Sequence, residues 1–225
     1  MDLHAELRAR LDAFHDLLDA DLTAPVAACP GWTLHELADH LGNENMWVTT
    51  AVREGHPNHE RSPAPREGLA EWFASTSASV LDALAADRDA PAWTFSPSRT
   101  VGFWLRRRTQ ETMVHLWDAE NALGETTPLD VELAADGVAE VFDTFAPRQI
   151  DLGRISRPGA AFRLRASDSG HTWSWGPGEP VAEITGPVAD LLLLLWKRIP
   201  AEHPTLTWTG DRSRGEALLG AALVP

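Results

Sequence analysis

The chain has 225 residues, 44% of them hydrophobic and 23% charged, which is ordinary for a globular protein with one large domain or two small ones. Its formal net charge of −14 argues against nucleic acid and anionic membrane surfaces as partners, because both attract clustered Lys and Arg side chains. A single cysteine excludes an internal disulfide and a cysteine-based zinc site, and the first residues lack the basic and apolar regions of a signal peptide, so we expect a cytoplasmic protein.

The first two-thirds of the chain show the hydrophobic spacing of helices. Residues 3–20 place apolar side chains close to a 3.6-residue period. A second helix begins after the Pro30-Gly31 turn, where Thr33 and Glu36 form a capping box, and extends to about residue 54. Three more helices are predicted at 66–86, 100–123 and 130–146. These elements predict an antiparallel, up-down four-helix bundle with one appended helix, within a domain of residues 1–150.

The pattern changes after Gly153. Residues 161–166 alternate apolar with charged side chains, and a turn at 168–170 leads into residues 171–175, which together predict a β-hairpin. Further elements are expected to be short strands at 181–184 and 206–208 and helices at 187–198 and 212–223. Residues 151–225 therefore form a small α+β domain, and the fold class of the whole chain is α+β.

The predicted 100–123 helix contains a pair of side chains suited to metal binding. Glu111 and His115 are four residues apart, so they point from the same face of a helix, one turn apart. His40, on the second predicted helix, is a third candidate ligand. Two histidines and one glutamate leave a fourth zinc position open, and an open position distinguishes catalytic from structural zinc sites.

Each candidate ligand also has an ordinary structural interpretation. Glu-x-x-x-His pairs occur by chance on helix surfaces, and a single histidine beside an apolar stripe is usually a hydrogen-bonded core residue. Glu44, four residues after His40, offers a second possible pair with that histidine. Asp118 either orients His115 from behind or is a solvent-facing helix charge.

Two segments, residues 30–41 and 111–120, resemble the signature segments of the mycothiol-dependent maleylpyruvate isomerase family. Residues 186–198 and 210–215 resemble the small C-terminal α+β domain of that family, so the likeness extends over essentially the whole chain. The resemblance implies a DinB-like four-helix bundle in which the His, Glu and His metal ligands of the family fall on His40, Glu111 and His115.

The resemblance also implies the cofactors and the chemistry. The metal is divalent, with zinc preferred and nickel or manganese as alternatives, and mycothiol is the cosubstrate for a small electrophilic substrate. A metal-bound thiol is deprotonated, so no protein cysteine is needed, and Cys29 is expected at a helix entrance rather than among the ligands. Arg198 is implied as a catalytic residue that pairs with a carboxylate, although a helix-terminal arginine facing the helix dipole is an alternative.

The chain departs from the common family pattern at four positions near the ligands. Members often have histidine or arginine where this chain has Asn45, Met46, Gln110 and Leu116. These changes leave the ligands intact and are expected to alter the lining of the substrate pocket.

Three functions stay open from the sequence. The first is a thiol-dependent isomerase or thiol S-transferase, which is favoured because no obvious general base accompanies the ligands, Glu44 being the one exception. The second is a metal-dependent hydrolase in which water is the nucleophile. The third is a non-catalytic protein that sequesters a metal or a thiol. A monomer or a small homo-oligomer is expected in each case.

Overall fold

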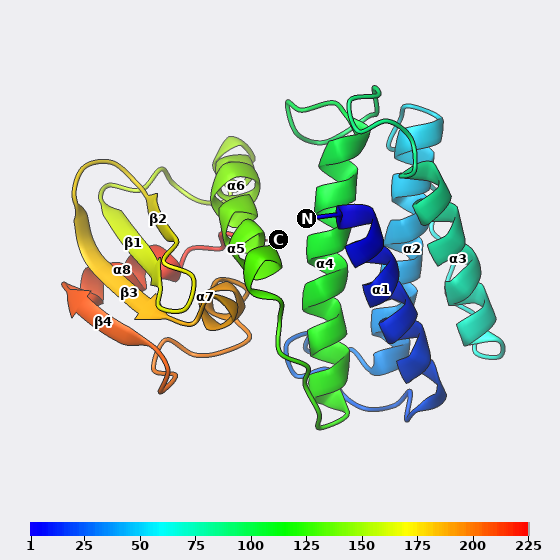
Figure 1. Cartoon of the computed structure of the whole chain (residues 1–225), viewed down its shortest axis with the longest axis horizontal. Coiled ribbons are helices and arrows are strands. Elements are labelled where there is room, and N and C mark those ends of the chain that lie inside the picture. Colours follow the sequence, from blue (N-terminus) through cyan, green and yellow to red (C-terminus); the bar gives the residue numbers. More distant parts are fainter. Residues whose placement is uncertain (225) are drawn as a thin grey trace. The chain divides into compact units, whose positions relative to one another are not determined.

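The computed structural model describes residues 1–224 and consists of two compact units, Met1–Thr127 and Pro128–Pro225. The predicted domain boundary after residue 150 is therefore placed too late in the chain. The reason is that α5 (Val131–Glu140) packs its buried apolar face against the leucine-rich α7 (Val188–Leu195), which belongs to the second unit (Figure 1). In residues 1–224 no helix has the length and apolar character needed to cross a membrane.

Four helices form the first unit. Each begins within three residues of its predicted first residue. They are α1 (Leu3–Asp16), α2 (Leu34–Arg53), α3 (Leu69–Ala83) and α4 (Val101–Ala122). A single 3₁₀ turn, Leu17–Asp19, extends α1. The predicted capping box is present, and the Thr33 backbone N–H donates to the Glu36 carboxylate at 2.9 Å.

The bundle is confirmed, but not all of its neighbouring helices are antiparallel. At the start of α2, His35 Nε2 lies 3.4 Å from the carbonyl oxygen of Pro65, which comes just before α3. At the end of α2, Arg53 pairs with Asp82 near the end of α3. The two helices therefore run in the same direction, and the connection 54–68 returns along the length of the bundle. Helix α1 packs against α3 and α4, and α4 packs against α1 and α2 (Figure 1).

The core of the bundle is built from the apolar stripes that the sequence predicts. Its fully buried side chains include Leu7, Leu11, Phe14, Leu34, Leu37, Leu41, Phe73 and Trp104. Close packing of α2 against α3 depends on Gly42, because a Cβ atom there would lie 2.2 Å from the ring of Trp72. The core holds α2 and α4 in fixed register, and these are the two helices that carry the candidate ligands.

The second unit has a four-stranded mixed sheet in the order β2–β1–β3–β4. The strands are β1 (Ala161–Ala166), β2 (Thr172–Trp175), β3 (Pro180–Gly186) and β4 (Thr207–Gly210). The predicted hairpin is confirmed as the antiparallel pair β1–β2, in which Phe162 lies opposite Trp175. β1 pairs in parallel with β3, and β3 pairs antiparallel with β4.

The helices of the second unit complete the α+β fold. A π-helical turn, Val141–Phe145, joins α5 to α6 (Ala146–Asp151), and α8 (Arg212–Leu219) follows β4. The predicted burial of the apolar helix α7 is confirmed, with Val188 and all five leucines of 191–195 buried. The α+β fold class predicted from the sequence is therefore confirmed.

Candidate metal centre

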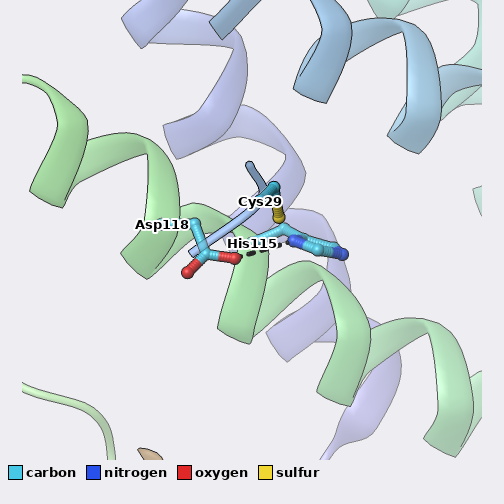
Figure 2. A group of neighbouring side chains, drawn as sticks. All are labelled: Cys29, His115 and Asp118. Atoms are coloured by element: carbon cyan, nitrogen blue, oxygen red, sulfur yellow. Dashed lines mark hydrogen bonds and ion pairs between the residues drawn. The ribbon is translucent and has the colours of Figure 1, made fainter. Parts of the chain in front are cut away.

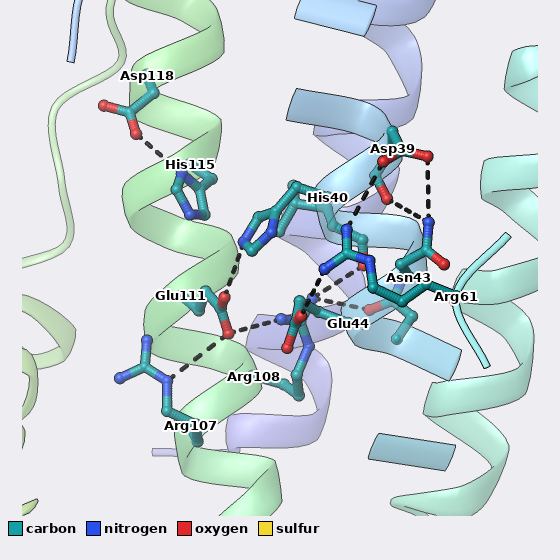
Figure 3. Close-up of polar contacts among 12 residues, drawn as sticks. Asp39, His40, Asn43, Glu44, Arg61, Arg107, Arg108, Glu111, His115 and Asp118 are labelled. Carbon is teal, nitrogen blue, oxygen red and sulfur yellow. Dashed lines mark hydrogen bonds and ion pairs between the residues drawn. The ribbon is translucent and has the colours of Figure 1, made fainter. Parts of the chain in front are cut away.

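The three predicted ligands converge between α2 and α4 (Figure 3). His40 Nε2 lies 3.2 Å from Glu111 Oε1, and the rings of His40 and His115 are 5.1 Å apart between centroids, nearly perpendicular. One potential ligand atom from each of the three residues lies within 4.8 Å of the other two. Antiparallel packing of α2 and α4 makes this possible, because it brings His40 level with the turn that joins Glu111 to His115.

The closest two of these donors are spaced like two ligands of a zinc-sized ion. Two ligand atoms bound to tetrahedral zinc at ~2.1 Å lie about 3.4 Å apart, close to the observed distance between His40 and Glu111. The three side chains are 20%, 17% and 9% exposed for His40, Glu111 and His115. The group is thus largely shielded from bulk water, with His40 and Glu111 more exposed than His115.

Glu111 is held in its charged form by two arginines and a histidine. Burial by itself raises the pKa of this carboxyl, but the positive charge of Arg108, the hydrogen bond with His40 and the charge of Arg107 together hold its pKa well below the usual range. The Arg108 Nη1 atom donates to Glu111 Oε2 at 2.7 Å. A permanently ionised carboxylate is a ready metal ligand at neutral pH.

Asp118 orients His115. Its carboxylate Oδ2 lies 2.9 Å from His115 Nδ1, and Asp118 is only 2% exposed, so the alternative of a solvent-facing helix charge is wrong. Burial lowers the pKa of His115, although the hydrogen bond and charge of Asp118 oppose that effect. A neutral ring that donates from Nδ1 to Asp118 leaves Nε2 free as a metal ligand, the arrangement common in zinc sites.

Cys29 lies closer to the centre than the sequence predicts. Its Sγ atom, a nitrogen of His115 and a carboxylate oxygen of Asp118 lie within 4.8 Å of one another (Figure 2). The loop before α2 brings the thiol there through a turn in which Trp32 N–H donates to the Cys29 carbonyl. The expectation that Cys29 lies away from the ligands is therefore wrong, since the thiol stands behind His115 on the side of Asp118.

Family models match both units of the chain. The mycothiol maleylpyruvate isomerase N-terminal domain matches residues 3–120, and the C-terminal domain of the same family matches residues 132–217. The chain belongs to the mycothiol maleylpyruvate isomerase family. The second match begins at residue 132, close to the boundary after Thr127. Its start agrees with the place of α5 in the second unit.

Solved structures share the fold of this family member. A mutant form of the mycothiol-dependent maleylpyruvate isomerase aligns with a TM-score of 0.71 and 14% identity over 92% of each chain. A second crystal structure of that isomerase aligns with a TM-score of 0.66 and 14% identity, over 86% of this chain and 87% of the other. At this level of identity the likeness concerns the fold.

Relatives also occur in Mycobacterium tuberculosis. The uncharacterized protein Rv0036c is 27% identical over 219 residues, covering 86% of this chain and 84% of the relative. The uncharacterized protein Rv0738 is 30% identical over 146 residues, covering 61% of this chain and 75% of the relative.

Glu44 lies near the ligands of this family member without joining them. Burial and the charge of Glu111 raise the pKa of Glu44, against the opposing charges of Arg108, His40 and Arg61. Arg61 reaches from the 54–68 connection to within 3.6 Å of the Glu44 carboxylate (Figure 3). Glu44 therefore lies in the electrostatic field of the candidate ligands and is paired with Arg61.

Two of the positions that depart from the family pattern are interior residues. Asn45 is 0% exposed and Gln110 is 1% exposed, whereas Met46 and Leu116 are partly exposed. The expectation that all four line a pocket is therefore wrong for Asn45, whose amide oxygen accepts from Arg108 at 2.8 Å.

Arg198 belongs to the second unit, directly after α7. Its Nη1 atom donates to the Trp196 carbonyl at 2.7 Å, and its guanidinium lies 5.5 Å from the centroid of the Trp196 ring. Lys197 adopts a left-handed conformation with φ of 59°, which ends the helix and directs Arg198 N–H back to the Leu193 carbonyl. The residue lines a cavity of about 450 Å³, and its catalytic role stays a prediction.

Proposed function

We propose that this chain is a mycothiol-dependent metalloenzyme that either isomerises a substrate of the maleylpyruvate type or transfers the thiol to an electrophile. The observation that carries the proposal is the convergence of His40, Glu111 and His115 from two helices, with a partly exposed side. Membership of the mycothiol maleylpyruvate isomerase family supports the same function.

The side chains of the centre have distinct roles in this proposal. His40 and His115 supply nitrogen donors, Glu111 supplies one negative charge, and Asp118 fixes the ring of His115. A zinc ion held by this donor set would favour the thiolate form of a small thiol, which is the nucleophile that addition to an electrophile requires. The substrate is then a small electrophilic molecule, and Arg198 is proposed to pair with a carboxylate group of the substrate or the thiol.

Glu44 supports a second candidate function, metal-dependent hydrolysis. A carboxyl group with a raised pKa next to the ligands is suited to accept and return the proton of an attacking water. The same group could equally receive the proton that a small thiol loses on ionisation. The two functions are separated by whether turnover needs an added thiol.

The test uses purified full-length protein loaded in turn with zinc, nickel and manganese. We expect one equivalent of metal per chain and turnover of maleylpyruvate, or of a bimane electrophile, that depends on mycothiol more than on glutathione. Hydrolysis of an ester or amide without any thiol would favour the hydrolase instead. Tight thiol binding without turnover of any substrate would leave the sequestering role, and a metal content far below one equivalent would overturn the metal centre itself.

A further inference from the structure

Arg108 is a buried arginine directly behind the candidate ligand Glu111. The residue is 0% exposed and lies on α4, one turn before Glu111. Its Nη1 atom donates to Glu111 Oε2 at 2.7 Å, and its Nη2 atom donates to Asn45 Oδ1 at 2.8 Å and, more weakly, to the Leu41 carbonyl at 3.5 Å. The guanidinium thus joins one ligand-bearing helix to the other (Figure 3).

These contacts divide the two oxygens of Glu111 between two partners. Arg108 holds Oε2, whereas Oε1 faces His40 Nε2 at 3.2 Å. Arg107 Nε also approaches Oε2, at 3.8 Å, so both positive charges are directed at the same oxygen of the carboxylate. Only Oε1 is then directed toward the place where the histidine nitrogens converge.

Asn45 fixes the guanidinium from the opposite helix. Its side chain is completely buried on α2, five residues after His40, and its amide nitrogen lies 3.5 Å from the hydroxyl oxygens of Thr76 and Ser77 on α3. A polar chain therefore extends from α3 through Asn45 and Arg108 to Glu111. Buried polar groups that are linked in this way have few alternative arrangements, so the carboxylate is held in one orientation.

We propose that Arg108 is a positioning residue that presents Glu111 to the metal through a single oxygen, with Asn45 as the anchor of the guanidinium. This inference rests on the proposed metal centre. The second oxygen, Oε2, is occupied by the guanidinium of Arg108, which is always charged and can donate two hydrogen bonds. This contact discourages coordination of the metal by both oxygens. The fourth position of the centre consequently stays open for a small ligand.

The arrangement also has an electrostatic consequence for ligand choice. The positive charge of Arg108 offsets the single negative charge that Glu111 contributes, so a divalent ion in this donor set keeps most of its own charge. An anionic thiolate is then a better ligand for the open position than a neutral molecule, because groups beyond the direct ligands tune the charge of a metal site.

The test compares wild type with Arg108→Gln, Arg108→Lys and Asn45→Ala in full-length protein. Zinc affinity is measured by competition with a chelator, and the coordination of bound cobalt is followed by the intensity of its visible d–d absorption. We expect Arg108→Gln to weaken zinc binding about 10- to 100-fold, because the loss of a fixed orientation of Glu111 costs more than the removal of the nearby positive charge gains. We also expect it to lower the cobalt absorption, because both oxygens of Glu111 can then bind and raise the coordination number. Arg108→Lys should restore part of the affinity without restoring the spectrum.

The control is Thr109→Val, the next residue on α4, which is equally buried and bonds to the carbonyls of Leu3 and Leu105 but not to Glu111. This variant should keep the zinc affinity and cobalt spectrum of wild type. A folded Arg108→Gln protein with both properties unchanged overturns the inference. If Arg108→Gln fails to fold, the zinc affinity and cobalt spectrum of Asn45→Ala are compared with those of wild type instead. A folded Asn45→Ala protein with both properties unchanged then overturns the inference. Failure of the wild-type protein to bind zinc or cobalt would instead overturn the proposed function.

Discussion

At the scale of the residue, the centre depends on which nitrogen of His115 stays available. Asp118 accepts from Nδ1 at 2.9 Å inside the bundle, and this bond selects the form of the ring that leaves Nε2 free. The proximity of the candidate ligands Glu111 and His115 could be predicted from the sequence, because a spacing of four on α4 places them on one face. Of the groups behind them, the sequence offers the orienting role of Asp118 only as one of two alternatives and does not indicate Arg108, because neither residue differs in sequence from an ordinary surface helix charge.

Replacing Asp118 by Ala is expected to weaken zinc binding about 10- to 100-fold, because the ring of His115 then loses its orientation and the proton is no longer fixed at Nδ1. Asp118→Asn should recover part of the loss, since the amide oxygen can still accept from Nδ1. Chelator competition on the two purified variants measures the difference. Equal affinities for wild type and Asp118→Ala would show that Asp118 does not support the ligand.

Cys29→Ser is expected to leave thiol-dependent turnover nearly intact, although the thiol lies close to His115. The reason is that the proposed nucleophile is the added small thiol, while Cys29 stands on the Asp118 side of the histidine. Steady-state rates of wild type and variant with saturating mycothiol make the comparison. Loss of most of the activity in a folded, metal-loaded Cys29→Ser protein would assign Cys29 a direct part in the reaction.

No periodicity links position 29 to position 115, so the sequence alone does not indicate that the Cys29 side chain lies beside His115.

At the scale of the element, the sequence predicts the helices well because their apolar stripes repeat every 3.6 residues and their starts carry capping residues. The direction of α3 has no such local signal. It follows from the 54–68 connection, which is held along α2 by a hydrogen bond from Ala64 N–H to Asp39 at 2.6 Å and another from Asn43 to the Ser62 carbonyl at 3.1 Å. These contacts form only once the chain has folded back.

Gly42→Ala is expected to destabilise the protein by about 1–3 kcal/mol, because the added methyl group meets the Trp72 ring between the parallel helices α2 and α3. Ala is otherwise the better helix former, so intrinsic propensity predicts the opposite sign. Urea unfolding of the two proteins at equal metal content measures the change. A matched control is the double variant Gly42→Ala with Trp72→Leu, in which the smaller side chain should relieve the clash. A Gly42→Ala protein as stable as wild type would show that Trp72 moves aside freely.

At the scale of the whole molecule, the division between Thr127 and Pro128 places all three ligands, together with Asp118 and Arg108, in one unit. The sequence placed this division near residue 150 because 130–146 continues the helical pattern of the bundle. Helical periodicity identifies a buried face but not the element that covers it. For α5 the covering element is α7, which lies more than 45 residues further along the chain.

A fragment of residues 1–127 is expected to bind one equivalent of zinc and to lack thiol-dependent turnover, because the ligands are retained whereas Arg198 is removed. Metal analysis after gel filtration and the bimane assay test the two halves of this prediction. Full-length Arg198→Ala is the companion variant, and it should keep the metal and lose activity. A fragment that turns over substrate as fast as the intact chain would limit the second unit to a structural role.

The ring of Trp32 lies 5.1 Å from that of His40, between centroids, and this contact gives the protein an optical signal of its own. The chain has ten tryptophans and no tyrosine, so its ultraviolet emission comes from indole alone. An ion that binds His40 alters the charge beside one of those fluorophores while the remaining tryptophans provide a constant background. Occupancy of the centre can therefore be read in real time from untagged protein, with Trp32→Phe as the silent reference.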